Sequence, residues 1–497
     1  MPTFLLHELL DETAARVPSA PALSTAESTL SYRELAALTR RAARWLSLQG
    51  VRRGDRVVIA GAHRALAVAL LYGCSRTGAI FSILHEQTTD RSLAHVLADA
   101  EPRILICDTD EAAQQALRHG VRGLHSDRVA EALEDVAGLA ADDGQPVPVL
   151  PVDPLCLIYT SGSTGLPKAV VSTHGQVLFA TAAIQSVLNY QGGDVIFVGL
   201  PLSFDYGLYQ LFLGAAAGAR VWLASPRDGG PLLLSALRRS GATVLPAVPS
   251  MAGNLARILE RYDGTAPLRL LTNTGAAMPA STLATLRRRI PGLHIQLMYG
   301  LTECKRAAIM PPDEDLGRPG ASGLALPGTE LLIVGPDGTT LPPGHTGEIV
   351  VRGPHVMSGY WRRPELTAQR FPRANGLFPQ LRTGDQGWLD EDGYLYFAGR
   401  DDDVYKSRGI RVSALEVEAA AYRVPGITGA AVLPPRDSRE EATLFAVTAL
   451  APAAVLTALR AELEPYKVPG RCVVVGRLPL SANGKTDRAR LPGLLAR

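Results

Sequence analysis

The sequence is poor in cysteine, and no two cysteines form a C-x-x-C pair. The five cysteines among 497 residues are scattered, most of them in apolar surroundings, which is typical of buried thiols in a reducing compartment. A disulfide scaffold is therefore not indicated. The sequence also lacks an apolar run long enough to span a bilayer, and acidic residues interrupt the first twelve positions where a signal peptide has a basic region. We expect a cytoplasmic protein.

An excess of one charge is also missing. The chain has 50 basic and 48 acidic residues, for a formal net charge of +2. This balance argues against a nucleic-acid-binding protein and against a protein held at a membrane by basic residues. Hydrophobic residues make up 46% of the chain, enough for a large core, and its length predicts roughly two to four structural units.

The first two thirds of the chain alternate helical and strand-like stretches. Residues 1–150 contain buried strand patterns such as 55–60 and 103–107, and residues 151–300 repeat the alternation. This pattern predicts an α/β fold with parallel strands. From about residue 325 the sequence pattern changes to short strand-like stretches separated by Gly/Pro turns, which indicates a β-rich subdomain.

A charged break at residues 399–403 divides the chain. We expect residues 1–398 to form a large N-terminal domain of layered sheets and helices, with the β-rich subdomain at about 325–398. Residues 404–497 are long enough for a small separate domain of α+β type.

A polar loop from Tyr159 to Lys168 lies between two apolar runs, residues 155–159 and 169–171. Its glycines allow close approach of the backbone to a phosphate, which amides, hydroxyls and the lysine then surround. The loop is not a Walker A motif, because Lys168 stands three residues after Gly165 instead of directly after it. Taken alone, it also fits a flexible surface turn.

Three other stretches carry groups suited to chemistry. The strand-like residues 296–299 lead into a turn that carries Glu303, and ligands gather at strand ends in α/β sheets. Asp385 lies on a turn, where it is suited to holding sugar hydroxyls, and Lys485 lies on a glycine-supported loop near the C-terminus. Each has a plain alternative when taken alone: a surface acid, a turn residue and a solvated lysine.

Six stretches in order closely resemble the adenylate-forming superfamily, which includes acyl-CoA synthetases, amino-acid- and aryl-acid-adenylating domains and firefly-type luciferases. The stretches are Tyr159–Lys168, Tyr299–Glu303, Gly347–Gly353, Arg382–Asp385, Gly399–Arg411 and Leu478–Lys485. The resemblance implies an AMP-forming ligase that uses ATP and Mg²⁺. A carboxylate attacks the α-phosphorus of ATP and releases pyrophosphate, and an acceptor then takes the acyl group and releases AMP.

The resemblance also implies residue roles. The loop hydroxyls and Lys168 hold the β- and γ-phosphates, while Glu303, preceded by Thr302, binds Mg²⁺, which prefers oxygen ligands. Tyr299 lies against the adenine, and Asp385 accepts hydrogen bonds from the ribose. The implied nucleotide site comprises Thr160, Ser161, Gly162, Ser163, Thr164, Gly165, Lys168, Gly275, Ala276, Ala277, Tyr299, Gly300, Asp385 and Arg400.

By the same resemblance, Lys485 lies between the substrate carboxylate and the α-phosphate, where two anions must meet. The C-terminal domain is mobile and swings about a hinge in Gly399–Asp403, with Asp402 as the pivot. The second orientation withdraws Lys485 and presents another face, including Lys406 and Gly409, to the acceptor channel. The alternative for residues 401–403 is a plain acidic turn.

The expected acid pocket consists of small, aromatic and sulfur-containing residues, which favour a compact or flat acid: Phe204, Asp205, Tyr206, Ser250, Met251, Thr274, Leu301 and Cys304. Asp205 has two interpretations. It binds an amine, a ring N–H or a hydroxyl of the acid, because a buried carboxylate needs a partner, or it caps the helix that begins at Tyr206. Lys305 is expected to be solvated, with contact to a phosphate of the acceptor as the alternative.

The acceptor stays open at this point. Because no carrier-type segment follows Arg497 in this sequence, we expect the acceptor to arrive in trans. CoA or the phosphopantetheine thiol of a separate carrier protein is preferred, and a free amine, which would make the chain an amide bond synthetase, is the alternative. A non-catalytic nucleotide- or acyl-binding relative is the alternative of another class, although such a protein would be expected to lack Lys485 or Glu303. We expect no nucleic-acid partner and no membrane insertion.

Overall fold

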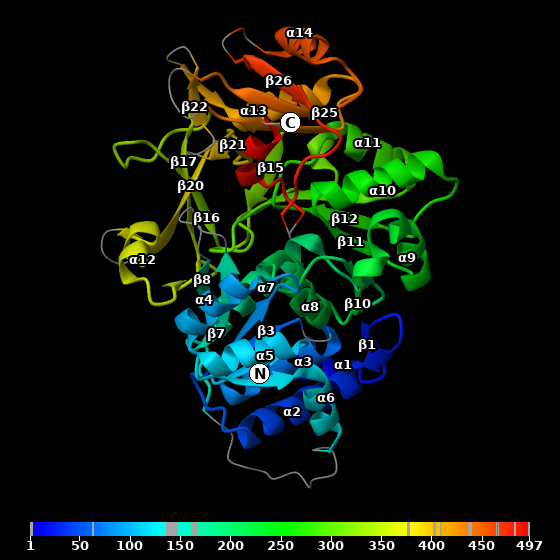
Figure 1. Ribbon diagram of the computed structural model, residues 1–497, viewed down its shortest axis with the longest axis vertical. Helices are drawn as coiled ribbons and strands as arrows, with labels where there is room; N and C mark the ends of the chain where they lie inside the picture. Colours follow the sequence, from blue (N-terminus) through cyan, green and yellow to red (C-terminus); the bar gives the residue numbers. More distant parts are fainter. Residues whose placement is uncertain are drawn as a thin grey trace.

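A computed structural model describes most of the chain, namely residues 3–61, 64–135, 148–160, 167–374, 378–400, 404–407, 410–435, 440–463, 465, 467–481 and 484–495. Helices and sheets are layered in a large N-terminal part, and a smaller C-terminal part covers one end of it (Figure 1). The expected α/β class is therefore confirmed. Within the described residues, no helix combines the length and the apolar composition needed to cross a membrane.

One sheet of the N-terminal part has seven strands in the order β18-β8-β7-β4-β3-β5-β6. Its central strands are parallel and buried on both faces, which explains their continuous apolar runs, such as residues 104–107. The strands are β3 (Arg56–Ala60), β4 (Ile80–Leu84), β5 (Ile104–Cys107), β6 (Arg122–His125), β7 (Pro154–Thr160), β8 (Lys168–Thr173) and β18 (Gly359–Tyr360).

Six helices accompany this sheet: α1 (Leu6–Arg16), α2 (Tyr32–Leu48), α3 (Arg64–Thr77), α4 (Asp90–Ala100), α5 (Asp110–Arg118) and α6 (Ser126–Asp135). Helix α2 shows why such a helix begins where it does. Ser31 accepts a hydrogen bond from the backbone N–H of Glu34, whose carboxylate accepts one from the backbone N–H of Ser31. This capping box satisfies backbone donors that the first helical turn leaves unpaired.

The second sheet is larger, with fourteen strands. Its parallel half contains β1 (Pro21–Ser24), β9 (Val195–Val198), β10 (Arg220–Leu223), β11 (Val244–Ala247), β12 (Leu270–Asn273) and β13 (His294–Tyr299), with β2 (Thr29–Ser31) antiparallel at its edge. The helices in this part are α7 (His174–Leu188), α8 (Asp205–Ala217), α9 (Leu233–Ser240), α10 (Pro249–Arg261) and α11 (Ala280–Arg289).

The β-rich region continues this sheet from β13 onward. The antiparallel strands are β14 (Ala308–Ile309), β15 (Ala321–Ala325), β16 (Glu330–Val334), β17 (Gly347–Arg352), β19 (Arg373–Ala374), β20 (Phe378–Leu389) and β21 (Leu395–Arg400), with helix α12 (Pro364–Arg370) beside them. The change from parallel to antiparallel pairing occurs directly after Tyr299, because β13 pairs antiparallel with β14. The β-rich region therefore begins near residue 308, earlier than the texture of the sequence indicated.

The C-terminal part has its own hydrophobic core, which includes Val417, Val432 and Leu444. It contains the hairpin β22 (Val404–Ser407) and β23 (Ile410–Ser413), the sheet β24 (Gly429–Leu433), β25 (Thr443–Val447) and β26 (Arg471–Val474), and helices α13 (Ala414–Arg423) and α14 (Pro452–Glu462). The segment after β26, red in Figure 1, descends from this part towards β11 and β12.

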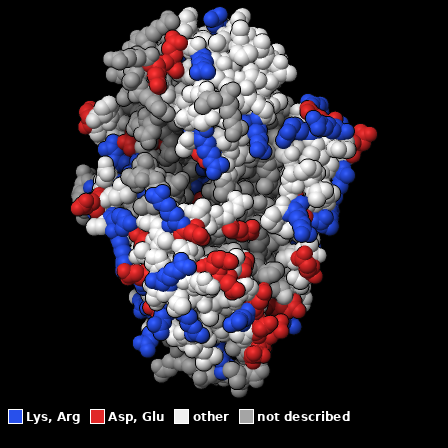
Figure 2. Space-filling view, in the orientation of Figure 1, with Lys and Arg blue, Asp and Glu red and all other residues white. Residues whose placement is uncertain are grey.

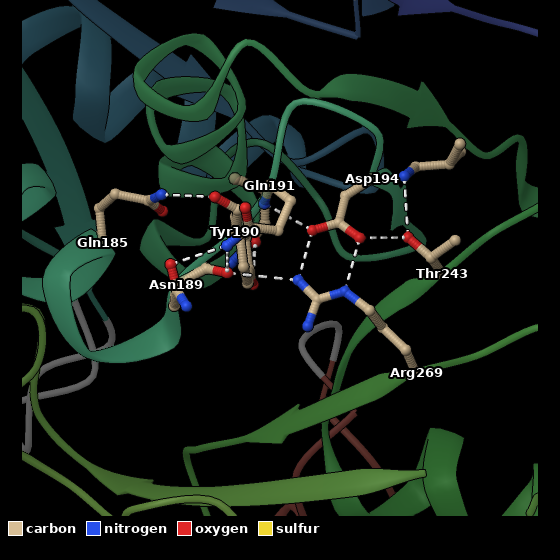
Figure 3. Close-up of polar contacts among 9 residues, drawn as sticks. Gln185, Asn189, Tyr190, Gln191, Asp194, Thr243 and Arg269 are labelled. Atoms are coloured by element: carbon tan, nitrogen blue, oxygen red, sulfur yellow. Dashed lines mark hydrogen bonds and ion pairs between the residues drawn. The ribbon is translucent and has the colours of Figure 1, made fainter. Parts of the chain in front are cut away.

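An ion-paired network holds the amino-terminal ends of three parallel strands together (Figure 3). The Arg269 guanidinium binds the Asp194 carboxylate in a bidentate manner, and Thr243 donates a hydrogen bond of 2.8 Å to the same carboxylate. Burial raises the pKa of Asp194, but the hydrogen bonds from Arg269 and from the backbone N–H of Gln191 outweigh it and lower the pKa overall. Because Val195 begins β9, this network fixes the strand ends opposite to those that reach the candidate site.

Candidate active site

The site begins where β12 and β13 end side by side. Their parallel register pairs Asn273 with Leu297, so the turn that contains Gly275 follows one strand and Tyr299 ends the other. The Tyr299 hydroxyl donates a 2.7 Å hydrogen bond to the Asp385 carboxylate. Burial and the charge of Asp385 raise the pKa of Tyr299 well above its usual value, so its hydroxyl stays protonated and can donate.

Asp385 lies within strand β20, and not on the turn that we expected, and it stands opposite Arg400 of β21 in the strand register. These two positions are therefore brought together with Tyr299, as the resemblance implied. Figure 2 shows charges of both signs scattered over one face of the molecule, with a hollow between the C-terminal part and the remainder.

Lys168, Tyr360 and Glu303 form a second cluster. The Lys168 ammonium donates a 2.8 Å hydrogen bond to the Tyr360 hydroxyl, which donates a 2.7 Å hydrogen bond to Oε1 of Glu303. Lys168 Nζ lies 3.6 Å from the same carboxylate oxygen. Sequence reasoning found Lys168 and Glu303 but missed Tyr360, which reaches them because its strand β18 pairs with β8.

The C-terminal part delivers Lys485 to the expected acid pocket. The Ser250 hydroxyl donates a 3.0 Å hydrogen bond to the carbonyl of Gly484, and Lys485 Nζ lies 5.5 Å from the centroid of the Phe204 ring. Gly275 has a φ of +92°, and a Cβ there would stand 2.8 Å from Cε of Lys485. A side chain at this position would therefore be strained by the positive φ and would require the end of the Lys485 side chain to shift.

Asp205 does not cap a helix. It is the first residue of α8. Phe204 occupies the capping position, and no side-chain hydrogen bond caps the helix there. Instead, the Asp205 carboxylate accepts a 3.2 Å hydrogen bond from Arg306, and both side chains are buried. The Thr302 hydroxyl lies at a longer 3.4 Å from the other carboxylate oxygen. The helix-cap interpretation was therefore wrong, and Arg306 is a partner that the sequence analysis missed.

Lys305 is not solvated either, contrary to expectation. Its side chain is completely buried, its Nζ donates a 2.9 Å hydrogen bond to the carbonyl of Thr302, and it lies 5.5 Å from the centroid of the Tyr209 ring. Burial lowers its pKa, although the charge of Asp205 opposes this effect. A backbone carbonyl and an aromatic ring therefore replace water around this cation.

Other expected pocket residues are buried to different degrees. Tyr206 is fully buried and shares a 2.7 Å hydrogen bond with Thr272, while Met251 is only partly buried. Thr274 is buried and Leu301 is partly exposed. Cys304 has no exposed surface and packs with Tyr299 in a hydrophobic cluster, and burial raises the pKa of its thiol to about 12. Cys304 is therefore part of the packing behind the site.

Several expected positions lie outside the described residues. These are Ser161, Gly162, Ser163, Thr164 and Gly165 of the phosphate loop, the proposed pivot Asp402, and Gly409. Lys406 is described only as a residue of strand β22. The described ends of the loop, Thr160 and Lys168, pair with each other across the β7–β8 hairpin.

The described groups fit a nucleotide with magnesium. Glu303 offers a carboxylate of the kind that Mg²⁺ prefers, and among the described residues no group donates a hydrogen bond to its Oε2. Lys168 supplies a cation beside it for phosphate oxygens, and the Tyr299–Asp385 pair offers a buried acceptor for hydroxyl groups.

Comparisons with known proteins agree with this geometry. The sequence matches the AMP-binding enzymes over residues 10–361 and their C-terminal domain over residues 416–485. Indoleacetate–CoA ligase of Aromatoleum aromaticum is 31% identical, with 99% of this chain and 98% of that protein covered. L-proline–[L-prolyl-carrier protein] ligase of Streptomyces coelicolor is 32% identical, with 97% and 94% covered.

Two solved structures extend the comparison. VinN in complex with L-aspartate is 40% identical with a TM-score of 0.73, covering 80% of this chain and 98% of that one. O-succinylbenzoate CoA synthetase from Bacillus subtilis, in complex with ATP and magnesium ion, is 26% identical with a TM-score of 0.82, covering 97% and 99%. The chain therefore belongs to the AMP-binding enzymes, the adenylate-forming superfamily of acid ligases, which use ATP and Mg²⁺.

Proposed function

We propose that this AMP-forming ligase activates a small amino acid that carries a second carboxylate, and that it passes the acyl group to a phosphopantetheine thiol. The observation that carries the choice of acid is the buried group of Asp205, Lys305 and Arg306. Lys485, inserted beside Gly275, is the cation proposed to meet the reacting carboxylate and the α-phosphate.

The charges in this group do not balance. Asp205 pairs with Arg306, but no carboxylate within the described residues lies within 4 Å of the Lys305 ammonium. Burying a cation without a direct ion-pair partner costs about 3 kcal/mol or more. The Tyr209 hydroxyl, also buried, has no hydrogen-bond partner. A second substrate carboxylate would supply the missing anion.

An amine on the same acid would suit Asp205. In a substrate with an ammonium and a second carboxylate, the ammonium would pair with Asp205 and the carboxylate would lie between the Lys305 and Arg306 cations. Among the described residues, the Asp205 oxygen that lies 3.4 Å from the Thr302 hydroxyl makes only this long contact. Binding of an ammonium group there would therefore break no shorter hydrogen bond. The relatives support an amino acid, since VinN was solved with L-aspartate and another relative is a ligase of L-proline. The CoA ligase of indoleacetate supports an aryl acid as the alternative.

A pocket beside Gly484 supports the choice of acceptor. It has a volume of about 310 Å³ and is lined by residues at the ends of β9, β10 and β11, including Pro201 and Ser250. Arginines adjoin its lining: Arg239 pairs with Asp228, and Arg257 contacts Asn254. Arg257, whose contact is the uncharged Asn254, suits the phosphate of a phosphopantetheine arm better than a free amine.

Acid-dependent exchange of labelled pyrophosphate into ATP tests the acid. The panel contains L-aspartate, L-asparagine without the second charge, succinate without the amine, L-proline and indole-3-acetate. We expect exchange to be highest with L-aspartate or a close analogue and at least tenfold lower with L-asparagine and succinate. Equal exchange with indole-3-acetate would contradict the proposal and favour an aryl acid.

The best acid is then incubated with ATP and one acceptor at a time: CoA, a phosphopantetheinylated carrier protein, or simple amines. We expect a thioester to form. The thiol that forms it, either CoA or the carrier protein, is then identified as the acceptor. Amide formation without thioester would establish the amide bond synthetase instead. An absence of exchange with every acid, despite ATP binding, would favour a non-catalytic relative.

A further inference from the structure

We propose that Tyr360 is a positioning residue of the magnesium–triphosphate site, whose hydroxyl keeps the Lys168 ammonium from donating a direct hydrogen bond to Glu303. The proposal goes beyond the acid and the acceptor. It depends on Glu303 and Lys168 serving magnesium and phosphate, and not on which acid the enzyme takes.

Tyr360 is held on several sides. Gly359 and Tyr360 pair with Val171 and Val170 of β8, the strand that begins with Lys168. The backbone N–H of Tyr360 donates a 3.0 Å hydrogen bond to the Thr367 hydroxyl. The ring stands edge-on to Phe371, at 5.5 Å between centroids. The position of the hydroxyl is therefore fixed by the strand pairing and by the packing of the ring.

The direction of both hydrogen bonds at the hydroxyl follows from chemistry. A lysine ammonium has only donors, so Tyr360 must accept from Lys168 and use its single proton towards Glu303. Burial, and then the negative charge of Glu303, raise the pKa of Tyr360. The phenol therefore keeps its proton and remains a donor to the carboxylate.

The hydroxyl separates two opposite charges. Lys168 Nζ lies 3.6 Å from Glu303 Oε1, while it lies 2.8 Å from the Tyr360 oxygen and 3.9 Å from the ring centroid. Without the hydroxyl, Lys168 can shorten this 3.6 Å ion pair to a direct hydrogen bond with the carboxylate. Magnesium would then compete with Lys168 for Glu303. Tyr360 also occupies Oε1, which leaves Oε2 for a metal.

The substitution Tyr360→Phe removes the hydroxyl and keeps the ring. Tyr32→Phe is the matched control, because the Tyr32 hydroxyl is equally buried and bonds only to the carbonyls of Gly214 and Ala219, at the far end of α8. Calorimetric titration with ATP, with and without Mg²⁺, gives a readout independent of turnover, and thermal unfolding reports on the fold.

We expect Tyr360→Phe to weaken binding of ATP with Mg²⁺ about tenfold, the effect of a charged hydrogen bond. Binding of ATP without Mg²⁺ should change much less, and the free Mg²⁺ required for half-maximal pyrophosphate exchange should rise. Tyr32→Phe should change none of these. Unchanged binding in Tyr360→Phe, or an equal loss with and without Mg²⁺, would overturn the proposal.

The variant Lys168→Met tests whether Tyr360→Phe acts through Lys168 or through a general structural effect. In Lys168→Met the cation that pairs with Glu303 is removed, so adding Tyr360→Phe should weaken binding of ATP with Mg²⁺ by no more than about twofold. A loss as large as in the parent enzyme would show that Tyr360 does not act through Lys168. Failure of every acid in the exchange assay would leave these binding measurements intact, so the two proposals fail separately.

Discussion

Arg306 donates a hydrogen bond of 3.2 Å to Asp205 although 101 residues separate them in the sequence. The pair joins the start of α8 to the segment after β13. Because both side chains are buried, any acid that binds beside Asp205 must either tolerate the ion pair or replace it.

The substitution Asp205→Asn should change the preference for the acid more than the affinity for ATP. The amide keeps the shape but loses the charge that an ammonium group needs, so kcat/KM for the best amino acid should fall at least tenfold relative to succinate. Arg306 would lose its carboxylate, so we expect the free energy of unfolding to fall by about 3 kcal/mol. Exchange kinetics across the acid panel and denaturant unfolding measure the two effects, and an equal loss of activity for all acids would contradict the first.

The substitution Lys485→Ala should abolish formation of the acyl-adenylate and spare transfer of the acyl group from a preformed adenylate. The physical reason is the meeting of two anions, which needs a cation only in the first step. Pyrophosphate exchange measures the first step, and thioester release from synthetic acyl-adenylate measures the second. An equal loss in both steps would contradict a domain movement that withdraws the lysine.

The substitution Gly275→Ala should impair the same first step through the same lysine. A methyl group would meet Cε of Lys485 at 2.8 Å, and the φ of +92° is unfavourable for alanine. We expect kcat for exchange to fall by about 10–100-fold, because displacement of a catalytic group by about 1 Å is costly. Gly253→Ala is the control, since a Cβ there meets no atom within 4 Å. If Gly275→Ala exchanged pyrophosphate normally, Lys485 would not depend on this turn.

The substitution His355→Leu should reduce the sensitivity of the fold to acid. His355 is fully buried, neither ring nitrogen has a hydrogen-bond partner, and burial lowers its pKa from 6.5 to about 4. Below pH 6.5 His355 therefore binds a proton in the unfolded chain but not in the folded chain. The free energy of unfolding then falls as the pH falls towards 4. For one histidine, the free energy of unfolding falls by about 3 kcal/mol between pH 6.5 and pH 4.

Half-buried His7 and buried His174 have pKa values of about 4 as well, so the variant should keep part of the slope. Denaturant unfolding at pH 7.5 and pH 5 measures the difference, with exposed His119→Gln as the control. A slope in His355→Leu as steep as that of the parent would show that His355 is protonated in the folded protein.

The fold class and the groups for the nucleotide were predictable because they depend on local sequence. Parallel strands are recognisable as apolar runs, and Glu303 follows the end of β13, whereas Asp385 lies inside β20 and not on the expected turn. Tyr360 and Arg306 were not predictable, because their contacts arise from strand pairing and from a helix start far away in the sequence. Lys305 was misjudged because charged side chains are usually solvated, and only the folded chain reveals the Thr302 carbonyl and the Tyr209 ring around it.

The pocket beside Gly484 has a consequence for inhibitor design. Its wall includes Pro201 and Ser250 from the large domain and Gly484 from the loop that carries Lys485. A compact ligand wedged there would contact both domains at once and favour the arrangement in which the lysine is inserted. Under the proposed domain movement, such a compound would leave pyrophosphate exchange running and would block transfer of the acyl group to the acceptor, because Lys485 could not withdraw.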